Sequence, residues 1–90
     1  MNINITGRNL KVDSDLSELI KTKLLNLKKY DSDITRIDVV LLKESRAEKI
    51  EVKIISNKNI YFVNCYTSVF EKTLAKAYSN LLVQIKKKKK

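Results

Sequence analysis

The sequence lacks histidine, proline and tryptophan, and it has one glycine and one cysteine among its 90 residues. With no histidine and a lone Cys65, the usual zinc sites and an internal disulfide framework are excluded. One glycine cannot build a glycine-rich phosphate loop. So few breakers of regular structure predict a chain made mostly of helices and strands.

Other absences narrow the class of protein further. No apolar run approaches the roughly 18 residues that a membrane span needs, and the alternating N-terminus does not resemble a signal peptide. Hydrophobic residues make up 43% and charged residues 32%, which is typical of one globular domain with one core at this length. We therefore expect a cytoplasmic protein in a reducing compartment, without a membrane partner.

The residues give little support for catalysis. Cys65 falls in the middle of a predicted strand, where cysteine is more often a small buried hydrophobe than a nucleophile. Five carboxylates are explained as caps and turns, and none falls in an apolar context that would suit it to acid–base work. They are Asp13, Asp15, Glu18, Asp31 and Asp33. We predict no enzymatic activity, no cofactor, no metal ion and no small-molecule substrate.

The first third of the chain predicts a strand followed by a helix. Residues 1–6 alternate polar and apolar side chains, and Gly7 closes this strand. A helix is predicted over 14–29, after a cluster of N-cap residues at 13–15, and a turn at 30–33 ends it. The helix carries an apolar stripe at three- and four-residue spacing: Leu16, Leu19, Ile20, Leu24 and Leu27.

The middle of the chain predicts three strands. Two alternating strands, from residue 34 and over 47–56, flank a polar turn at 43–46 and have clear apolar faces. These faces are Ile37, Val39 and Leu41 in the first strand and Ile50, Val52 and Ile54 in the second. A turn at 57–59 leads to a strand over 60–66. Both of its alternating faces are fairly apolar, so its core face stays open.

A second helix completes an α+β fold. Ser68 and Glu71 form a capping box that opens the helix. Its apolar stripe is Phe70, Leu74, Ala77, Tyr78, Leu81 and Ile85. The order β-α-β-β-β-α predicts one domain over 1–85, with a four-stranded mixed sheet formed by a parallel crossover and two hairpins. Both helices pack on one face, as in a double-stranded-RNA-binding domain, and leave the other face polar. Residues 86–90 form a basic C-terminal tail.

The charge is strongly positive and unevenly distributed. Nineteen basic and ten acidic residues give a net charge of +9, which points toward polyanionic partners. Without the five lysines at 86–90, fourteen basic residues face the ten acidic ones, and the net charge is only +4. A nucleic-acid interpretation therefore also needs basic residues on the folded body.

Lysines on the polar sides of both predicted helices would form one convex basic surface. At about 100° per residue, Lys72 and Lys76 lie opposite the apolar stripe of the second helix. Lys21, Lys28 and Lys29 likewise lie away from the stripe of the first. Such a surface would contact phosphates without reading bases. It is equally well explained as a solvated face that keeps a small protein soluble.

The lysine run at 86–90 has two interpretations, an arm for RNA or an attachment to anionic lipid. No lipidation signal or large apolar face supports the lipid interpretation. Few exposed aromatic residues are expected among the lysines, which disfavours single-strand stacking. A double-stranded or structured RNA, recognised by its shape and backbone, fits better.

Short motifs spread along the chain carry a resemblance to a known family. In chain order they are Asn2–Leu10, Lys21–Tyr30, Ile37–Leu41, Glu51-Val52, Ser68–Glu71 and Gln84–Lys87. In order and spacing they resemble segments of the bacterial ribosome hibernation-promoting factor family, also called protein Y or ribosome-associated inhibitor. The match covers nearly the whole chain, and the family has the same β-α-β-β-β-α order.

The chain departs from the family pattern in its second half. Ser68 stands where the family has Asp, Ala75 where it commonly has another Asp, and residues 57–59 replace a glycine-rich hairpin. Three uncharged positions stand where the family often has lysine or arginine: Asn80, Leu82 and Val83. These departures shift the expected RNA contacts toward the tail. The chain resembles the short form of the family, without a C-terminal dimerisation domain.

The resemblance implies a translation inhibitor that occupies the tRNA and mRNA channel of the small ribosomal subunit under stress or in stationary phase. Its partner would be 16S-type ribosomal RNA, and the free protein would be monomeric. Together with the charge map it predicts these rRNA contacts: Arg8, Lys21, Lys23, Lys28, Lys29, Lys72, Lys76, Lys86, Lys87, Lys88, Lys89 and Lys90. Of these, Lys23 lies nearest the apolar stripe, where its stem can snorkel. The alternatives are a general structured-RNA-binding module, or a non-enzymatic scaffold protein whose lysine tail binds acidic partners.

Overall fold

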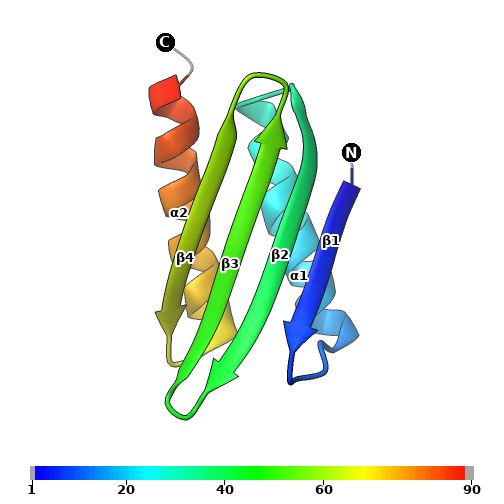
Figure 1. Cartoon of the computed structure of the whole chain (residues 1–90), viewed down its shortest axis with the longest axis vertical. Coiled ribbons are helices and arrows are strands. Elements are labelled where there is room, and N and C mark those ends of the chain that lie inside the picture. Colours follow the sequence, from blue (N-terminus) through cyan, green and yellow to red (C-terminus); the bar gives the residue numbers. More distant parts are fainter. Residues whose placement is uncertain (1, 89–90) are drawn as a thin grey trace.

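The computed structural model describes residues 2–88. Within these residues the chain forms four strands, two α-helices and one short 3-10 helix (Figure 1). In chain order they are β1 (Asn2–Arg8), α1 (Ser14–Leu25), the 3-10 helix η1 (Asn26–Lys29), β2 (Ile34–Glu44), β3 (Ala47–Ser56), β4 (Ile60–Thr67) and α2 (Phe70–Lys88). The predicted β-α-β-β-β-α order is confirmed, and the first helix ends in a tighter 3-10 turn.

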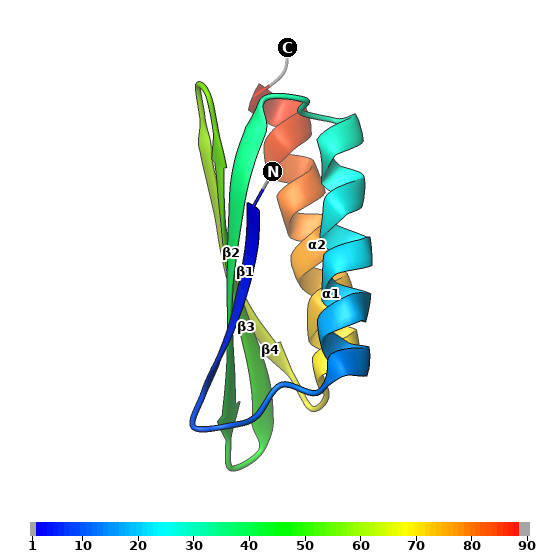
Figure 2. The ribbon, with the colours of Figure 1, turned by 90° about the vertical axis from the view of Figure 1, so that its right-hand side faces the viewer.

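The strands form one mixed sheet in the order β1-β2-β3-β4. β1 and β2 are parallel, with Ile3 opposite Ile37 and Ile5 opposite Val39, and α1 makes the crossover between them. The other two pairs are antiparallel hairpins. Both helices cover the same face of the sheet and leave its other face open (Figure 2). The predicted α+β fold is therefore confirmed.

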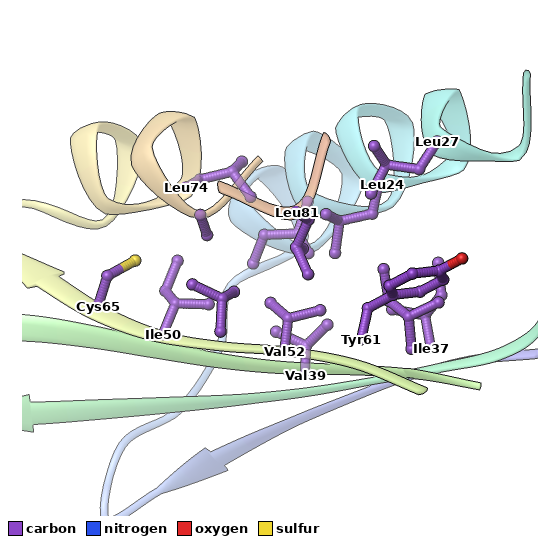
Figure 3. Packing of buried hydrophobic residues seen from close by; sticks show 14 of the residues in the cluster. Leu24, Leu27, Ile37, Val39, Ile50, Val52, Tyr61, Cys65, Leu74 and Leu81 are labelled. Atoms are coloured by element: carbon purple, nitrogen blue, oxygen red, sulfur yellow. The ribbon is translucent and has the colours of Figure 1, made fainter. Parts of the chain in front are cut away.

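The hydrophobic core lies between the sheet and the helices (Figure 3). The predicted inward faces of β2 and β3 are buried, and Leu24 and Leu81 reach the same core from the two helices. In β4 the side chains that face the core are Tyr61, Val63 and Cys65. The structure thus decides the core face that the alternating pattern left open.

The open face of the sheet is not the purely polar surface that was predicted. β4 turns Ile60, Phe62 and Tyr66 to this side, and each is more than half exposed. Because both alternating sets of β4 are apolar, burying one set on the core necessarily turns the other toward solvent.

Gly7 lies inside β1 rather than closing it. The strand continues to Arg8, and Asn9 has a φ of 58°, in the left-handed region that asparagine tolerates. A Cβ atom on Gly7 would lie 2.5 Å from the backbone carbonyl oxygen of Leu10. Glycine is therefore needed at this position because the segment after the strand folds back against it.

Leu19 does not share the burial of the predicted helical stripe and is 42% exposed. It lines an open hollow of about 400 Å³ between the first turns of α1 and α2. The other lining residues are Asp13, Asp15, Leu16, Glu48, Phe70 and Glu71. The prediction that Leu19 is buried was wrong, because the two helices do not close over the core at this end.

The predicted capping box at Ser68 is also wrong, because α2 begins at Phe70. The backbone N–H of Phe70 donates to Oε1 of Glu48, on β3, at 2.6 Å. The buried Thr73 hydroxyl donates to the backbone carbonyl oxygen of Glu48 at 2.8 Å. A residue 22 positions away along the chain therefore caps the helix.

Asp31 combines its predicted turn role with a buried position. Its Oδ1 accepts a hydrogen bond from the backbone N–H of Asp33 at 3.0 Å. The residue is only 3% exposed, and its Oδ2 accepts a hydrogen bond from the hydroxyl of Tyr61 at 2.8 Å. The prediction that no carboxylate lies in an apolar context is wrong for this residue.

Candidate nucleic-acid interface

The two helices run in the same direction, so their first turns lie at one end of the molecule and their last turns at the other (Figures 1 and 2). This alignment brings together lysines that are far apart in the sequence. We call the exposed lysines at the C-terminal ends of η1 and α2 the basic end: Lys28, Lys29, Lys86, Lys87 and Lys88. Lysine is favourable there because a helix C-terminus carries partial negative charge.

At the opposite end of the molecule, carboxylates lie in the first turns of both helices, and Lys72 lies beside one of them. Asp15 and Glu71 lie in the first turns of the two helices, and the N-cap Asp13 accepts a hydrogen bond from the backbone N–H of Leu16 at 2.8 Å. On the helical side of the molecule, whose longest dimension is 40 Å, the positive charge is therefore densest at the basic end. A polyanion is attracted most strongly to that end.

The sheet contributes a further lysine to the basic end. Lys58 belongs to the turn between β3 and β4, and it lines a hollow of about 460 Å³ together with Lys88. Lys58 was not among the predicted rRNA contacts. Its position in a predicted turn indicated an exposed positive charge, but only the folded chain places that turn beside the end of α2.

Three further lysines are exposed on the outer sides of the helices, and we call them the helix-face lysines. Lys21 is exposed on α1, and Lys72 and Lys76 are exposed in the first two turns of α2, as predicted. Among residues 2–88, none of the three forms an ion pair. Their charges are therefore available to an external anion.

Two other lysines also contact aromatic rings within the protein. The ammonium of Lys23, on α1, lies 4.7 Å from the centroid of the Tyr78 ring on α2. That of Lys86 lies 5.7 Å from the centroid of the Tyr30 ring, just after η1. These cation–π contacts join the two helical segments. Lys23 is half-buried, as its position near the apolar stripe indicated.

Arg8 lies apart from the other predicted contacts. It is exposed at the C-terminal end of β1, opposite Leu42, and so lies near the end where the helices begin. Its alternation with Gly7, Ile5 and Ile3 places it on the open face of the sheet rather than on the helical side. The structure therefore does not bring Arg8 together with the helix lysines.

The uncharged stretch late in α2 has structural roles. The side-chain amide of Gln84 donates to the backbone carbonyl oxygen of Phe62 at 2.7 Å and accepts from the backbone N–H of Phe62 at 3.2 Å. Asn80 accepts a second hydrogen bond from that amide at 2.8 Å. Leu82 packs against the core, while Val83 is 53% exposed. These contacts cover part of the outer edge of β4, which limits unwanted strand pairing.

The lysine run at 86–90 is helical as far as Lys88. Lys86, Lys87 and Lys88 are therefore positioned by α2 instead of belonging to a loose arm. Lys89 and Lys90, which were also predicted as contacts, lie outside the described residues.

Residues 2–88 contain one cysteine, Cys65. Cys65 is buried, and burial raises the pKa of its thiol, which keeps it protonated at neutral pH. No three His, Cys, Asp or Glu side chains in this part of the chain are grouped as metal ligands. None of its helices is both long and apolar enough to span a bilayer. The positioned lysines remain as the most prominent functional feature.

Comparison with known proteins agrees with this architecture. Residues 3–90 match the model of a family described as Sigma 54 modulation protein / S30EA ribosomal protein. A ribosomal subunit interface protein from Coxiella burnetii has a similar structure, with a TM-score of 0.93 and 19% sequence identity over 99% of this chain and 98% of that one. The N-terminal domain of Thermus thermophilus Protein Y has a TM-score of 0.90 and 23% identity over 99% of this chain and 100% of that one. At these identities the two structures establish a shared fold. No curated protein matches the chain by sequence.

Proposed function

Because the chain belongs to the Sigma 54 modulation protein / S30EA ribosomal protein family, we propose that it is a ribosome-binding translation inhibitor. The family membership confirms the resemblance to hibernation-promoting factors and protein Y. In this proposal the protein acts in the cytoplasm under stress or in stationary phase. It is a monomer when free, and it occupies the tRNA and mRNA channel of the small ribosomal subunit.

The observation that carries the proposal is the placement of the basic end and the helix-face lysines on one side of a small rigid body. Phosphate contacts of this kind fix the position and orientation of a protein on RNA without reading its sequence. A compact wedge held by many such contacts excludes tRNA by volume, so inhibition requires no catalytic step.

The proposed contacts follow the geometry. The basic end, with Lys58, and the helix-face lysines form the main surface on rRNA. Lys23 contributes less, because its ammonium already lies over Tyr78. Arg8 is a separate contact, since it lies on the other face of the sheet. Lys89 and Lys90 stay predicted contacts, and the division into a domain at 1–85 and a tail at 86–90 stays a prediction.

Sedimentation tests the ribosomal role. Lysates from growing and starved cultures are separated on sucrose gradients, and the protein is detected in each fraction. We expect it to sediment with ribosomes or small subunits, more strongly after starvation. If the protein stays at the top of both gradients, the ribosomal role is excluded.

Competition with tRNA for purified small subunits tests which surface recognises them. The double substitution Lys72→Glu and Lys76→Glu lowers the net charge from +9 to +5. The matched control is Lys11→Glu with Arg46→Glu, which makes the same charge change at two exposed residues, in the loop after β1 and in the turn between β2 and β3. We expect the helix variant to lose competition and the loop variant to keep most of it.

Deletion of 86–90 lowers the net charge to +4, a change of similar size. We expect this variant to keep some competition at low salt, because the helix-face lysines remain in place. Equal losses in all three variants would mean that only net charge matters. The protein would then be a general structured-RNA-binding module, not a factor shaped for the ribosome.

A further inference from the structure

The open face of the sheet exposes three large apolar side chains that come from one strand. Ile60, Phe62 and Tyr66 on β4 are 63%, 51% and 62% exposed. Both helices lie on the opposite face, so neither covers these side chains (Figure 2). Adjoining exposed apolar side chains on a soluble domain commonly mark a binding surface.

The strand register places a lysine directly opposite each aromatic ring. Phe62 pairs with Lys53 across the β3–β4 ladder, and Tyr66 pairs with Lys49. The two pairs are separated by four residues on each strand, which corresponds to about 13 Å at 3.3 Å per residue. Directly opposite residues on one face have Cβ atoms about 5 Å apart. The face thus repeats the same unit, a ring beside an ammonium, at two positions.

Among residues 2–88, these rings and lysines form no cation–π contact and no ion pair. Within residues 2–88, the cation–π contacts involve Lys23 and Lys86 and not these two rings. In the same part of the chain, neither Lys49 nor Lys53 forms an ion pair. A base can therefore stack on either ring, and both ammonium groups can donate hydrogen bonds to a phosphate.

The carboxylates of the open face offset part of this positive charge, because Asp38 lies directly opposite Lys53 across the β2–β3 ladder. Asp38 accepts hydrogen bonds from Asn4 at 3.1 Å and from Arg36 at 3.0 Å. The Asn4 hydrogen bond lowers the pKa of Asp38, and Arg36 and the charge of Lys53 act in the same direction. Glu44 lies at the end of β2, opposite Ala47. Glu51, between the two lysines, is half-buried and lies opposite Asn64.

We propose that the open face of β3 and β4 binds single-stranded RNA, with bases stacked on Phe62 and Tyr66 and phosphates held by Lys49 and Lys53. Stacking tolerates any sequence because every base has a π face. Four-stranded sheets with exposed aromatic residues bind single-stranded RNA in this way in other folds, which is an analogy of geometry. The amide of Asn64 lies between the rings, where it can bond a base edge.

This surface is separate from the main one assigned to rRNA, and of the proposed rRNA contacts that the structure describes, only Arg8, on β1, lies on the same open face. The helix-face lysines and Phe62 lie on opposite sides of the molecule, so one protein can hold structured RNA on its helices and a single strand on its sheet. The expectation that exposed aromatic residues are scarce among the lysines is corrected by the register of β4, which places a lysine opposite each of two exposed rings.

Fluorescence anisotropy of a labelled oligouridylate of about ten nucleotides tests the proposal, because sites of this kind cover about 4–16 nucleotides. The test variant carries Phe62→Ala and Tyr66→Ala, which leaves the net charge at +9. The matched control carries Leu25→Ala and Val83→Ala, which removes two exposed apolar side chains from the helical side. We expect the test variant to bind at least about tenfold more weakly than the parent, and the control to bind like the parent.

The salt dependence separates stacking from charge. Raising the salt concentration should lower the affinity of every variant for RNA. The ratio of the parent's affinity to that of the test variant should stay constant, because the rings are neutral. The single substitution Phe62→Trp gives a direct probe, since the chain has no other tryptophan. RNA should quench its fluorescence, and the affinity should stay at least equal to that of the parent.

Equal affinity of the parent and the Phe62→Ala, Tyr66→Ala variant overturns the proposal, and so does a tryptophan signal that RNA leaves unchanged. A parent that dimerises in sedimentation while this variant does not, with equal RNA affinity, would assign the face to a second copy of the chain. The variant should still compete with tRNA for small subunits. The two proposals can therefore fail independently.

Discussion

The hydroxyl of Tyr61, on β4, donates a hydrogen bond of 2.8 Å to Oδ2 of Asp31, 30 residues earlier in the chain. Both residues are buried, at 1% and 3% exposure. The other carboxylate oxygen of Asp31 accepts from the backbone N–H of Asp33 at 3.0 Å. Asp31 thus ties the turn that follows η1 to the last strand of the sheet.

This contact predicts a clear loss of stability for Tyr61→Phe. The substitution removes the hydroxyl and deprives a buried carboxylate of a donor, which costs about 1.5–3 kcal/mol. Tyr66→Phe is the matched control, because the Tyr66 side chain is exposed on the open face. Urea unfolding of both variants and the parent measures the difference. If the two variants unfold at the same urea concentration, the buried hydrogen bond contributes little.

The same pair predicts a loss of stability at high pH. Burial, together with the hydrogen bond and charge of Asp31, raises the pKa of Tyr61 from 10.0 to about 12. The unfolded chain therefore releases this proton before the folded protein does. The stabilisation is fully present below pH 10 and is lost as the pH rises from 10 to about 12.

Urea midpoints measured from pH 9 to 12 should fall more steeply for the parent than for Tyr61→Phe. The two proteins differ only by the Tyr61 hydroxyl, so the difference between the two curves isolates Tyr61. If the urea midpoints of the two proteins fall in parallel with pH, the raised pKa of Tyr61 is contradicted.

The packing of the core predicts a large loss of stability on truncating one leucine of α1 and a small loss on truncating another. Leu24 is fully buried, while Leu19 is 42% exposed at the open hollow between the helices. Leu24→Ala should lower the free energy of unfolding by about 2–5 kcal/mol through the lost contacts and the cavity left behind. Leu19→Ala should change it by less than about 1 kcal/mol. Thermal melts of the two variants compare the positions directly, and similar losses would mean that both leucines are buried.

The hydrogen bond between Glu48 and the Phe70 N–H predicts that a residue of the sheet caps α2. Glu48→Ala removes the carboxylate that accepts from the Phe70 N–H and also pairs with Lys43 at 3.5 Å. We expect a loss of about 1 kcal/mol, as for other helix caps. Ser68→Ala should leave the stability unchanged, because Ser68 precedes the helix and is exposed. Chemical unfolding of both variants decides between the two caps, and a larger loss for Ser68→Ala would restore the local capping box.

The proposed rRNA contacts predict a steep dependence of small-subunit binding on salt. Each neutralised phosphate releases counterions, so affinity should fall strongly between about 50 and 200 mM salt. Replacing Lys72 and Lys76 by Gln should reduce the slope of log affinity against log salt by about 2, one for each lost phosphate contact. Filter binding over a salt series measures this slope. A nearly flat dependence would exclude phosphate contacts as the main source of affinity.

Local patterns along the chain are sufficient to predict the elements of this fold and most of its buried faces. The two-residue period of β2 and β3 and the three- to four-residue spacing in the helices specify which side chains share a face, because that relation depends only on local backbone geometry. The spacing of apolar residues therefore identified Ile37 and Val52 as core residues, and Lys72 and Lys76 as exposed residues, without any knowledge of the fold.

The relations between distant segments depend on how the elements pack against one another. Both faces of β4 are apolar, so the packing of α2 on the sheet selected Tyr61 for the core and left Phe62 in solvent. Glu48 replaces Ser68 at the start of α2, and Tyr61 makes Asp31 a buried residue. The basic end joins η1, the β3–β4 turn and α2 because the two helices run in the same direction. Periodicity carries no information about such neighbours, since their distance is set by how the elements pack and not by their spacing along the chain.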